Sequence, residues 1–176
     1  MSTRGFVGFK KNKRIKGWYN HHDSYPTSLG VEVFEKCLLH NVEELKSFFD
    51  RIEFVKDDGY ENHKSIFEMD WGFDRPVMED GGNFYKDGLF CEWSYIFDFD
   101  HRSLKVYRGF GKVPDRGHKD WCYRGKGSGE TFYVNMVADY DFEMLRLCVP
   151  DKLAKDLEES IKAKEEMVME PSTCSH

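Results

Sequence analysis

The stretch that most constrains the fold is Leu89–Phe99, a nearly continuous run of aromatic and aliphatic residues. The polar residues Asp100–Ser103 interrupt the run, and Leu104–Arg108 resumes it. Two such segments around a short polar turn are typical of an antiparallel β-hairpin. The sequence therefore predicts a hairpin here, and the remaining elements have to be placed around it.

A second hairpin is predicted at the N-terminus. Thr3–Phe9 has the pattern of a short strand, and Arg14–Tyr19 returns after a polar turn. Thr131–Ala138 and Leu145–Val149 are predicted as further strands. The N-terminal turn can grip phosphate, or it can be a solvated turn that protects an edge strand from pairing. Its positive residues are Lys10, Lys11, Lys13, Arg14 and Lys16.

Three amphipathic helices are predicted. Apolar residues recur at helical spacing from Leu29 to Leu38 and again from Leu45 to Ile52. Asn41 separates the two segments, and Glu44 follows it at the spacing of a capping box. Pro150 stands near the start of a closing helix. The predicted fold class is α+β, in which antiparallel β-hairpins form a sheet and the two consecutive helices and the C-terminal helix pack on it.

Size and composition indicate a single cytoplasmic domain. The chain has 176 residues, of which 40% are hydrophobic and 16% aromatic, so residues 1–166 are predicted to form one domain and 167–176 a flexible tail. A net charge of −6 argues against sequence-specific nucleic-acid binding. No segment has the apolar length of a signal peptide or membrane span, so we expect no membrane association.

The cysteines are predicted to be reduced thiols, because their number is odd and no C-x-x-C pair is present. We expect no cofactor and no structural zinc site. The five positions are Cys37, Cys91, Cys122, Cys148 and Cys174.

The segment Trp18–Pro26 concentrates more proton-donating and proton-accepting side chains than any other. Tyr19, Ser24 and Tyr25 are candidate ligand-binding residues there, and the candidate catalytic residues are Asn20, His21, His22 and Asp23. One histidine paired with Asp23 would serve as a general acid or base. A structural alternative also stays open, in which Asn20, Asp23 and Ser24 pin the loop before the first helix.

Metal binding at this segment is a further alternative. The ligands would be His21, His22 and Asp23, completed by Glu92 or His40. Adjacent histidines point in opposite directions in extended chain, however, and the helical i, i+4 spacing of a zinc site is missing. The prediction is therefore that no metal is bound.

Two other positions are candidate ligand-binding residues. Glu92 lies inside an aromatic run, where an unpaired carboxylate is costly to bury, so it either meets a partner near the Trp18–Pro26 segment or faces solvent. Lys126 lies in the basic glycine-rich stretch Gly125–Gly129. This stretch lacks the spacing of a phosphate-binding P-loop, and we expect a basic loop that acts as a lid or an anion clamp.

The segment 57–80 is acidic and also carries aromatic residues. Its glycines and Pro76 predict a long surface excursion, and such excursions are often functional. Apolar and polar residues alternate from Phe67 to Phe73, which predicts a half-exposed strand. The segment is either an ordinary loop or a surface that docks on a partner protein.

The N-terminus offers a different nucleophile. Removal of Met1 would leave Ser2 with a free α-amine, which can act as the base for its own hydroxyl. The opening Met1–Phe9, a return strand and then Tyr-Asn-His-His-Asp resembles the start of N-terminal-nucleophile amidohydrolases. The resemblance covers about the first 25 residues and implies Ser2 as nucleophile, Arg4 and Asp23 as orienting residues, and Asn20 as part of the oxyanion site.

The wider pattern resembles small uncharacterised proteins of bacteria and their phages. It comprises Thr-Arg-Gly near the start, Tyr-Asn-His-x-Asp-Ser-Tyr-Pro, Leu-Gly and Leu-Phe-Cys-Glu-Trp-Ser-Tyr. Two functions stay open. One is a hydrolase-like protein with a site for a small polar or anionic ligand, and the other is a non-catalytic phage or mobile-element protein that binds and inhibits a host protein through residues 57–80. The oligomeric state is left open.

Overall fold

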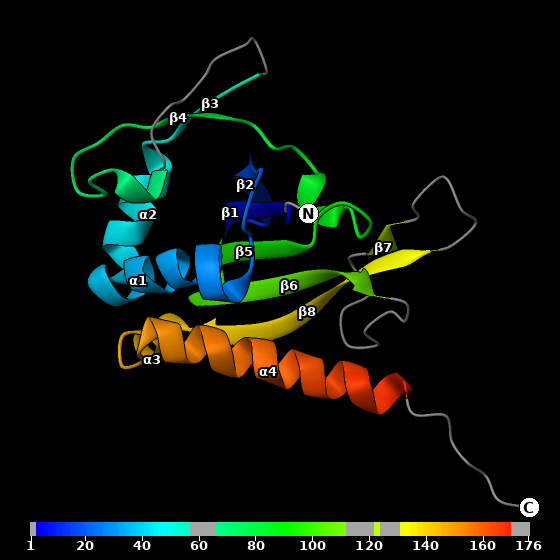
Figure 1. Ribbon diagram of the computed structural model, residues 1–176. Helices are drawn as coiled ribbons and strands as arrows, with labels where there is room; N and C mark the ends of the chain where they lie inside the picture. The colour runs from blue at the N-terminus through cyan, green and yellow to red at the C-terminus, as the bar shows by residue number, and fades with distance from the viewer. Residues whose placement is uncertain (1–2, 57–65, 112–121, 124–130, 170–176) are drawn as a thin grey trace, which may run out of the picture.

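The computed structural model describes residues 3–56, 66–111, 122–123 and 131–169. Its centre is a six-stranded sheet in the order β2-β1-β5-β6-β8-β7 (Figure 1). All neighbours pair antiparallel except β1 and β5, which run parallel, so the α+β class is confirmed and the sheet is mixed. The strands are β1 (Gly5–Lys11), β2 (Arg14–Asn20), β5 (Trp93–Asp98), β6 (Ser103–Gly111), β7 (Cys122–Tyr123) and β8 (Phe132–Asp141).

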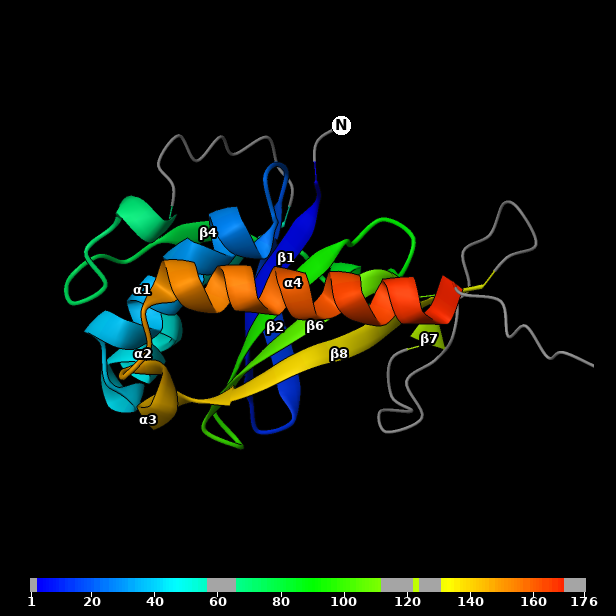
Figure 2. The same cartoon turned by 60° about the horizontal axis from the view of Figure 1, so that its bottom comes forward.

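The helices pack on one face of this sheet (Figures 1 and 2). Val7, Tyr95 and Phe97 of the sheet form one core cluster with Phe34 and Leu157 of the helices. The apolar stripes predicted for the three helices are therefore the faces that pack against the sheet. The elements are the π-helical turn η1 (Pro26–Gly30), α1 (Val31–Leu39), α2 (Val42–Asp50), α3 (Phe142–Leu145) and α4 (Pro150–Met169).

The predicted capping box opens α2. The Asn41 side chain accepts hydrogen bonds from the backbone N–H groups of Glu43 and Glu44, both at 3.0 Å. The Glu44 carboxylate accepts the N–H of Asn41 at 2.8 Å in return. The box satisfies backbone donors at the helix start, which explains why α1 and α2 are separate helices.

The strand predicted across Phe67–Phe73 is wrong. The segment begins with the 3₁₀ turn η2 (Ile66–Glu68), and Trp71 is buried with its ring stacked on Phe48, at 4.1 Å between centroids. Phe73 is 85% exposed. The alternating pattern failed because Trp71 packs into the main core through a turn. The flanking strands β3 (Glu53–Val55) and β4 (Val77–Glu79) form a separate two-stranded sheet.

The strand predicted at Leu145–Val149 is also wrong. Leu145 ends the short helix α3, and Leu147 and Val149 are exposed in the turn that leads to α4. Asp141 begins α3 by accepting the backbone N–H groups of Glu143 and Met144. This cap turns the chain out of β8 immediately, so no room is left for another strand.

The opposite face of the sheet is covered in part by the 3₁₀ turn η3 (Phe84–Lys86). Tyr85 packs on Phe6 with a centroid distance of 5.2 Å, and Ile96 and Tyr107 join this smaller cluster. In the part of the chain that the structure describes, no helix covers this face. The region between η3 and the tips of the β1–β2 and β5–β6 hairpins is therefore left open.

A search of the described residues finds no helix with both the length and the apolar character needed to cross a membrane.

Candidate functional site

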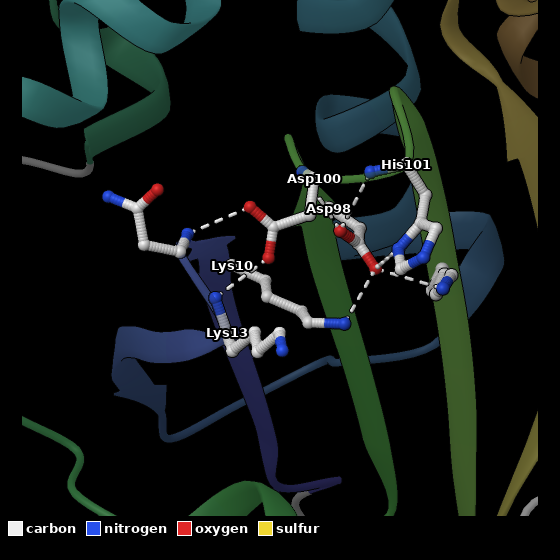
Figure 3. A network of polar contacts seen from close by, with 7 residues as sticks. Lys10, Lys13, Asp98, Asp100 and His101 are labelled. Carbon is white, nitrogen blue, oxygen red and sulfur yellow. Dashed lines mark hydrogen bonds and ion pairs between the residues drawn. The ribbon is translucent and has the colours of Figure 1, made fainter.

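A polar cluster joins the tips of the two hairpins on the open face (Figure 3). Asp98, the last residue of β5, has a fully buried side chain. Its Oδ2 accepts hydrogen bonds from Lys105 at 2.8 Å and Lys10 at 3.2 Å, and it lies 2.9 Å from Nδ1 of His101. A buried carboxylate held by specific charged partners at the edge of a hollow is a candidate for a functional site.

The strand register explains why these groups meet. Lys10 of β1 lies opposite Asp98 of β5, and Lys105 of β6 lies opposite Ile96, two residues from Asp98 on the same face. His101 comes from the turn, where Oδ1 of Asp98 accepts its backbone N–H and that of Asp100. The carboxylate is therefore held by both the sheet and the turn.

The environment of Asp98 favours its charged form. Burial alone would raise the pKa of Asp98, but hydrogen bonds from Lys105 and His101 and the charges of Lys105 and Lys10 lower the pKa to about 2. Asp98 is therefore ionised near neutral pH.

Asp100 links the second hairpin to the first. Its carboxylate accepts the backbone N–H groups of Asn12 and Lys13, each at 2.8 Å. Both residues have positive φ, 53° and 64°, as a two-residue hairpin turn requires. Hydrogen bonding from Lys13 lowers the pKa of Asp100. This arrangement fixes the Lys13 backbone beside the cluster.

The cluster borders a hollow of about 820 Å³ on the open face. This volume lies within the range of about 300–1,000 Å³ that is usual for small-molecule sites. Four lysines and two carboxylates line the hollow, so its lining carries surplus positive charge even when His101 is neutral. The lining residues are Lys10, Asn12, Lys13, Ile15, Tyr85, Lys86, Ile96, Asp98, Asp100, His101, Lys105 and Tyr107.

Asp98, His101 and Lys105 were not predicted as site residues from the sequence. Lys10 and Lys13 were noticed only as members of a basic turn. A usable signal was present, because Asp98 and Lys105 are charged residues next to the aromatic and aliphatic residues of β5 and β6. The register that brings β1 beside β5 was the missing information.

The Asn20–Ser24 loop is held by its own side chains. The Asn20 amide donates to Ser24 Oγ at 2.8 Å and to the backbone carbonyl of His22. Ser24 is fully buried, and its carbonyl accepts the hydroxyl of Tyr95 at 2.9 Å. Asp23 is exposed with a φ of 50°. These contacts agree with the alternative in which Asn20 and Ser24 pin the loop before the first helix. The catalytic role of the loop stays a prediction.

The two histidines of this loop are exposed. The ring of His21 contacts Tyr19 edge-on at 4.3 Å, and the rings of His21 and His22 lie 6.1 Å apart. Neither is placed with Asp98. Among the described residues, no group of three His, Cys, Asp or Glu side chains is arranged to hold a metal ion.

The structure does bring other predicted residues together at the start of β1. The Ser24 N–H donates to the Thr3 carbonyl at 3.2 Å, and the Glu92 N–H donates to the Arg4 carbonyl at 3.0 Å. The Arg4 guanidinium lies over the ring of Phe90. Tyr25 and Glu92 line a second cavity of about 430 Å³ between the sheet and α4.

Several predicted positions lie outside the described residues. These are Ser2, Lys126 with the rest of its glycine-rich loop, the 57–65 part of the acidic segment, and the tail from residue 170 onward. Cys37 and Cys91 are buried free thiols, as expected for core residues, and burial raises the pKa of Cys91 to about 12.

The chain was compared with models of known protein families, with curated proteins and with solved structures, and none of the three comparisons found a match.

Proposed function

We propose that this protein binds a small anionic ligand in the hollow between η3 and the two hairpin tips. The observation that carries the proposal is the fully buried Asp98 carboxylate, which holds Lys10 and Lys105 in place at the floor of the hollow. A lysine ammonium has three N–H donors. Among the described residues, each of these two lysines pairs with Asp98 alone, which leaves donors that can face an anion.

Further positive charge supports the proposal. Lys13 and Lys86 also line the hollow, and within the described residues neither takes part in an ion pair. Lys86 lies 5.4 Å from the ring centroid of Tyr85, which places its charge at the η3 side. Preorganised lysines around a partly enclosed cavity favour anions, because hydrogen bonds to charged groups are about twice as strong as neutral ones.

The test replaces the two rim lysines and leaves Asp98 and its partners intact. Inorganic phosphate binding is measured by isothermal titration calorimetry at low salt. The double variant Lys13→Gln, Lys86→Gln is expected to bind about thirtyfold more weakly, because each of the two lost charge-assisted contacts contributes on the order of 1 kcal/mol at a partly exposed site.

The matched control is the double variant Lys152→Gln, Lys155→Gln, which removes the same charge from the exposed side of α4. It is expected to bind phosphate as the native protein does. Equal weakening by both double variants would mean that only net charge matters. That result would contradict a site in the hollow.

A hydrolase-like activity at the start of β1 is a second candidate function. It is favoured by the grouping of Arg4, Ser24 and Glu92 next to a cavity that Tyr25 also lines. The resemblance to N-terminal-nucleophile amidohydrolases implies Ser2 as the nucleophile, Asp23 as an orienting residue and Asn20 as part of the oxyanion site. Release of Met1 is a requirement of this mechanism.

The intact mass of the purified, untagged protein tests this requirement. We expect the mass to lack Met1, and Ser2→Ala and Asp23→Ala to abolish hydrolysis of an acyl p-nitroanilide that the native protein cleaves. Ser28→Ala, at an exposed serine of η1, is the control and should leave turnover unchanged. Retention of Met1, or full activity of Ser2→Ala, would remove this candidate.

A further inference from the structure

Charged and apolar side chains both line the hollow, and the strand register shows that they lie next to one another. Asp98 and Lys10 lie opposite each other near the hairpin tips, and Ile15 lies opposite Lys10 in the same row. Ile96 lies one row further in, opposite Lys105, and Tyr107 one row beyond that, opposite Ser94. The polar residues Asn12, Lys13 and His101 are all at the tip end. The apolar part of the lining is therefore made of Ile15, Tyr85, Ile96 and Tyr107, with Lys86 and Lys105 beside it.

Two glycines make room for the aromatic ring that supports η3. Gly8 and Gly17 face each other in the β1–β2 register, and the ring of Phe6 lies over both. A Cβ at Gly17 would come within 2.6 Å of that ring. Phe6 in turn supports Tyr85 of η3. The apolar wall is thus a fixed part of the fold beside the lysines.

We infer that the ligand is a phosphate monoester with an apolar or aromatic body. This inference rests on the proposed anion site. Four lysines against two carboxylates leave a surplus that matches a dianion, and the phosphate would lie at the tip end with Lys10, Lys13 and Lys105. The body of the ligand would lie on Ile15, Ile96 and Tyr107, where a bare inorganic ion gains nothing.

The test compares three probes by calorimetry: phenyl phosphate, inorganic phosphate and phenol. Phenyl phosphate is expected to bind at least about tenfold more tightly than either of the other two, because only it can contact both the lysines and the apolar side chains of the hollow. Phosphate that binds as tightly as phenyl phosphate would overturn the inference and keep the anion site. Failure of both phosphate probes to bind would overturn the proposed function itself.

Two variants separate the apolar contacts from the charged ones. Ile15→Thr trims the apolar wall at a half-buried position of β2 and is expected to weaken phenyl phosphate about threefold while leaving inorganic phosphate unchanged. Lys13→Gln is expected to weaken both probes by the same factor. Thermal melts of both variants check that the fold is retained. Equal weakening of both probes by Ile15→Thr would contradict contact between the ring and this wall.

Discussion

Replacing Asp98 by alanine is expected to lower the free energy of unfolding by roughly 3 kcal/mol. The substitution leaves Lys10 and Lys105 side by side without the carboxylate that both contact, and it removes the acceptor for two backbone N–H groups of the turn. The two lysines are partly exposed, which places the cost at the low end of the range for a broken buried ion pair. Urea unfolding followed by circular dichroism measures the loss.

The control is Asp139→Ala, at an exposed aspartate of β8. Its effect is expected to stay within about 0.5 kcal/mol, as is usual for surface positions. If Asp98→Ala were as stable as Asp139→Ala, the carboxylate would not organise the cluster, and the argument for a fixed lysine pair would be lost.

The lowered pKa of Asp98 also predicts that the free energy of unfolding falls in acid. The pKa of Asp98 is lowered from 3.8 to about 2 in the folded protein, so its stabilisation is fully present above the unfolded value and is lost as the pH falls through the folded value. Between about pH 5 and pH 2 the native protein should lose roughly 1–2 kcal/mol that Asp98→Asn does not lose, after allowance for solvent at the open hollow. Parallel pH profiles of the two proteins would contradict this assignment.

Trp71→Ala is expected to cost about 3–5 kcal/mol, the usual range for removing a buried aromatic ring. The indole is 2% exposed, stacks on Phe48 and donates its Nε1–H to the carbonyl of Ile66 at 2.9 Å. The loss would leave a cavity in the main core and remove one of the two donors to the Ile66 carbonyl, which also accepts the Met69 N–H at 3.3 Å. Chemical unfolding measures it, with no change expected in phosphate affinity because Trp71 is on the helix side of the sheet.

Phe73→Ala is the matched control, since Phe73 is two residues away and 85% exposed. Its expected effect is below about 0.5 kcal/mol. The alternating pattern predicts the same burial for Trp71 and Phe73, whereas in the structure Trp71 is buried and Phe73 is exposed. Similar costs for the two substitutions would mean that this segment packs differently from the structure described.

Elements governed by neighbouring residues could be predicted from the sequence. The Leu89–Arg108 hairpin follows from two apolar runs around one turn, and the capping box follows from the spacing of Asn41 and Glu44. The parallel pairing of β1 with β5 could not be predicted, because it joins strands some 80 residues apart. Trp71 was misplaced for the same reason: its burial depends on α2, which lies far from it in the sequence.

In the candidate site, too, local features could be predicted and contacts between distant segments could not. Counting polar groups along the chain pointed to Asn20–Ser24, where the described contacts tie Asn20 to Ser24 and the loop to Thr3. A His–Asp pair was predicted in this loop and stays a prediction, while the structure shows such a pair at His101 and Asp98. Those residues gather with Lys10 only through tertiary pairing. A search for charged residues inside apolar strands would have raised Asp98 and Lys105 as candidates.

The most direct test of the anion-binding hollow is a ¹H–¹⁵N NMR titration of the whole chain with phenyl phosphate. The account predicts saturable shifts of the backbone amides of 10–15 and 96–107, around the two hairpin tips. The amides of Tyr25, Glu92 and 158–165, which border the second cavity, should not move. Shifts confined to that second cavity, or no saturable shift at any amide, would contradict the central claim.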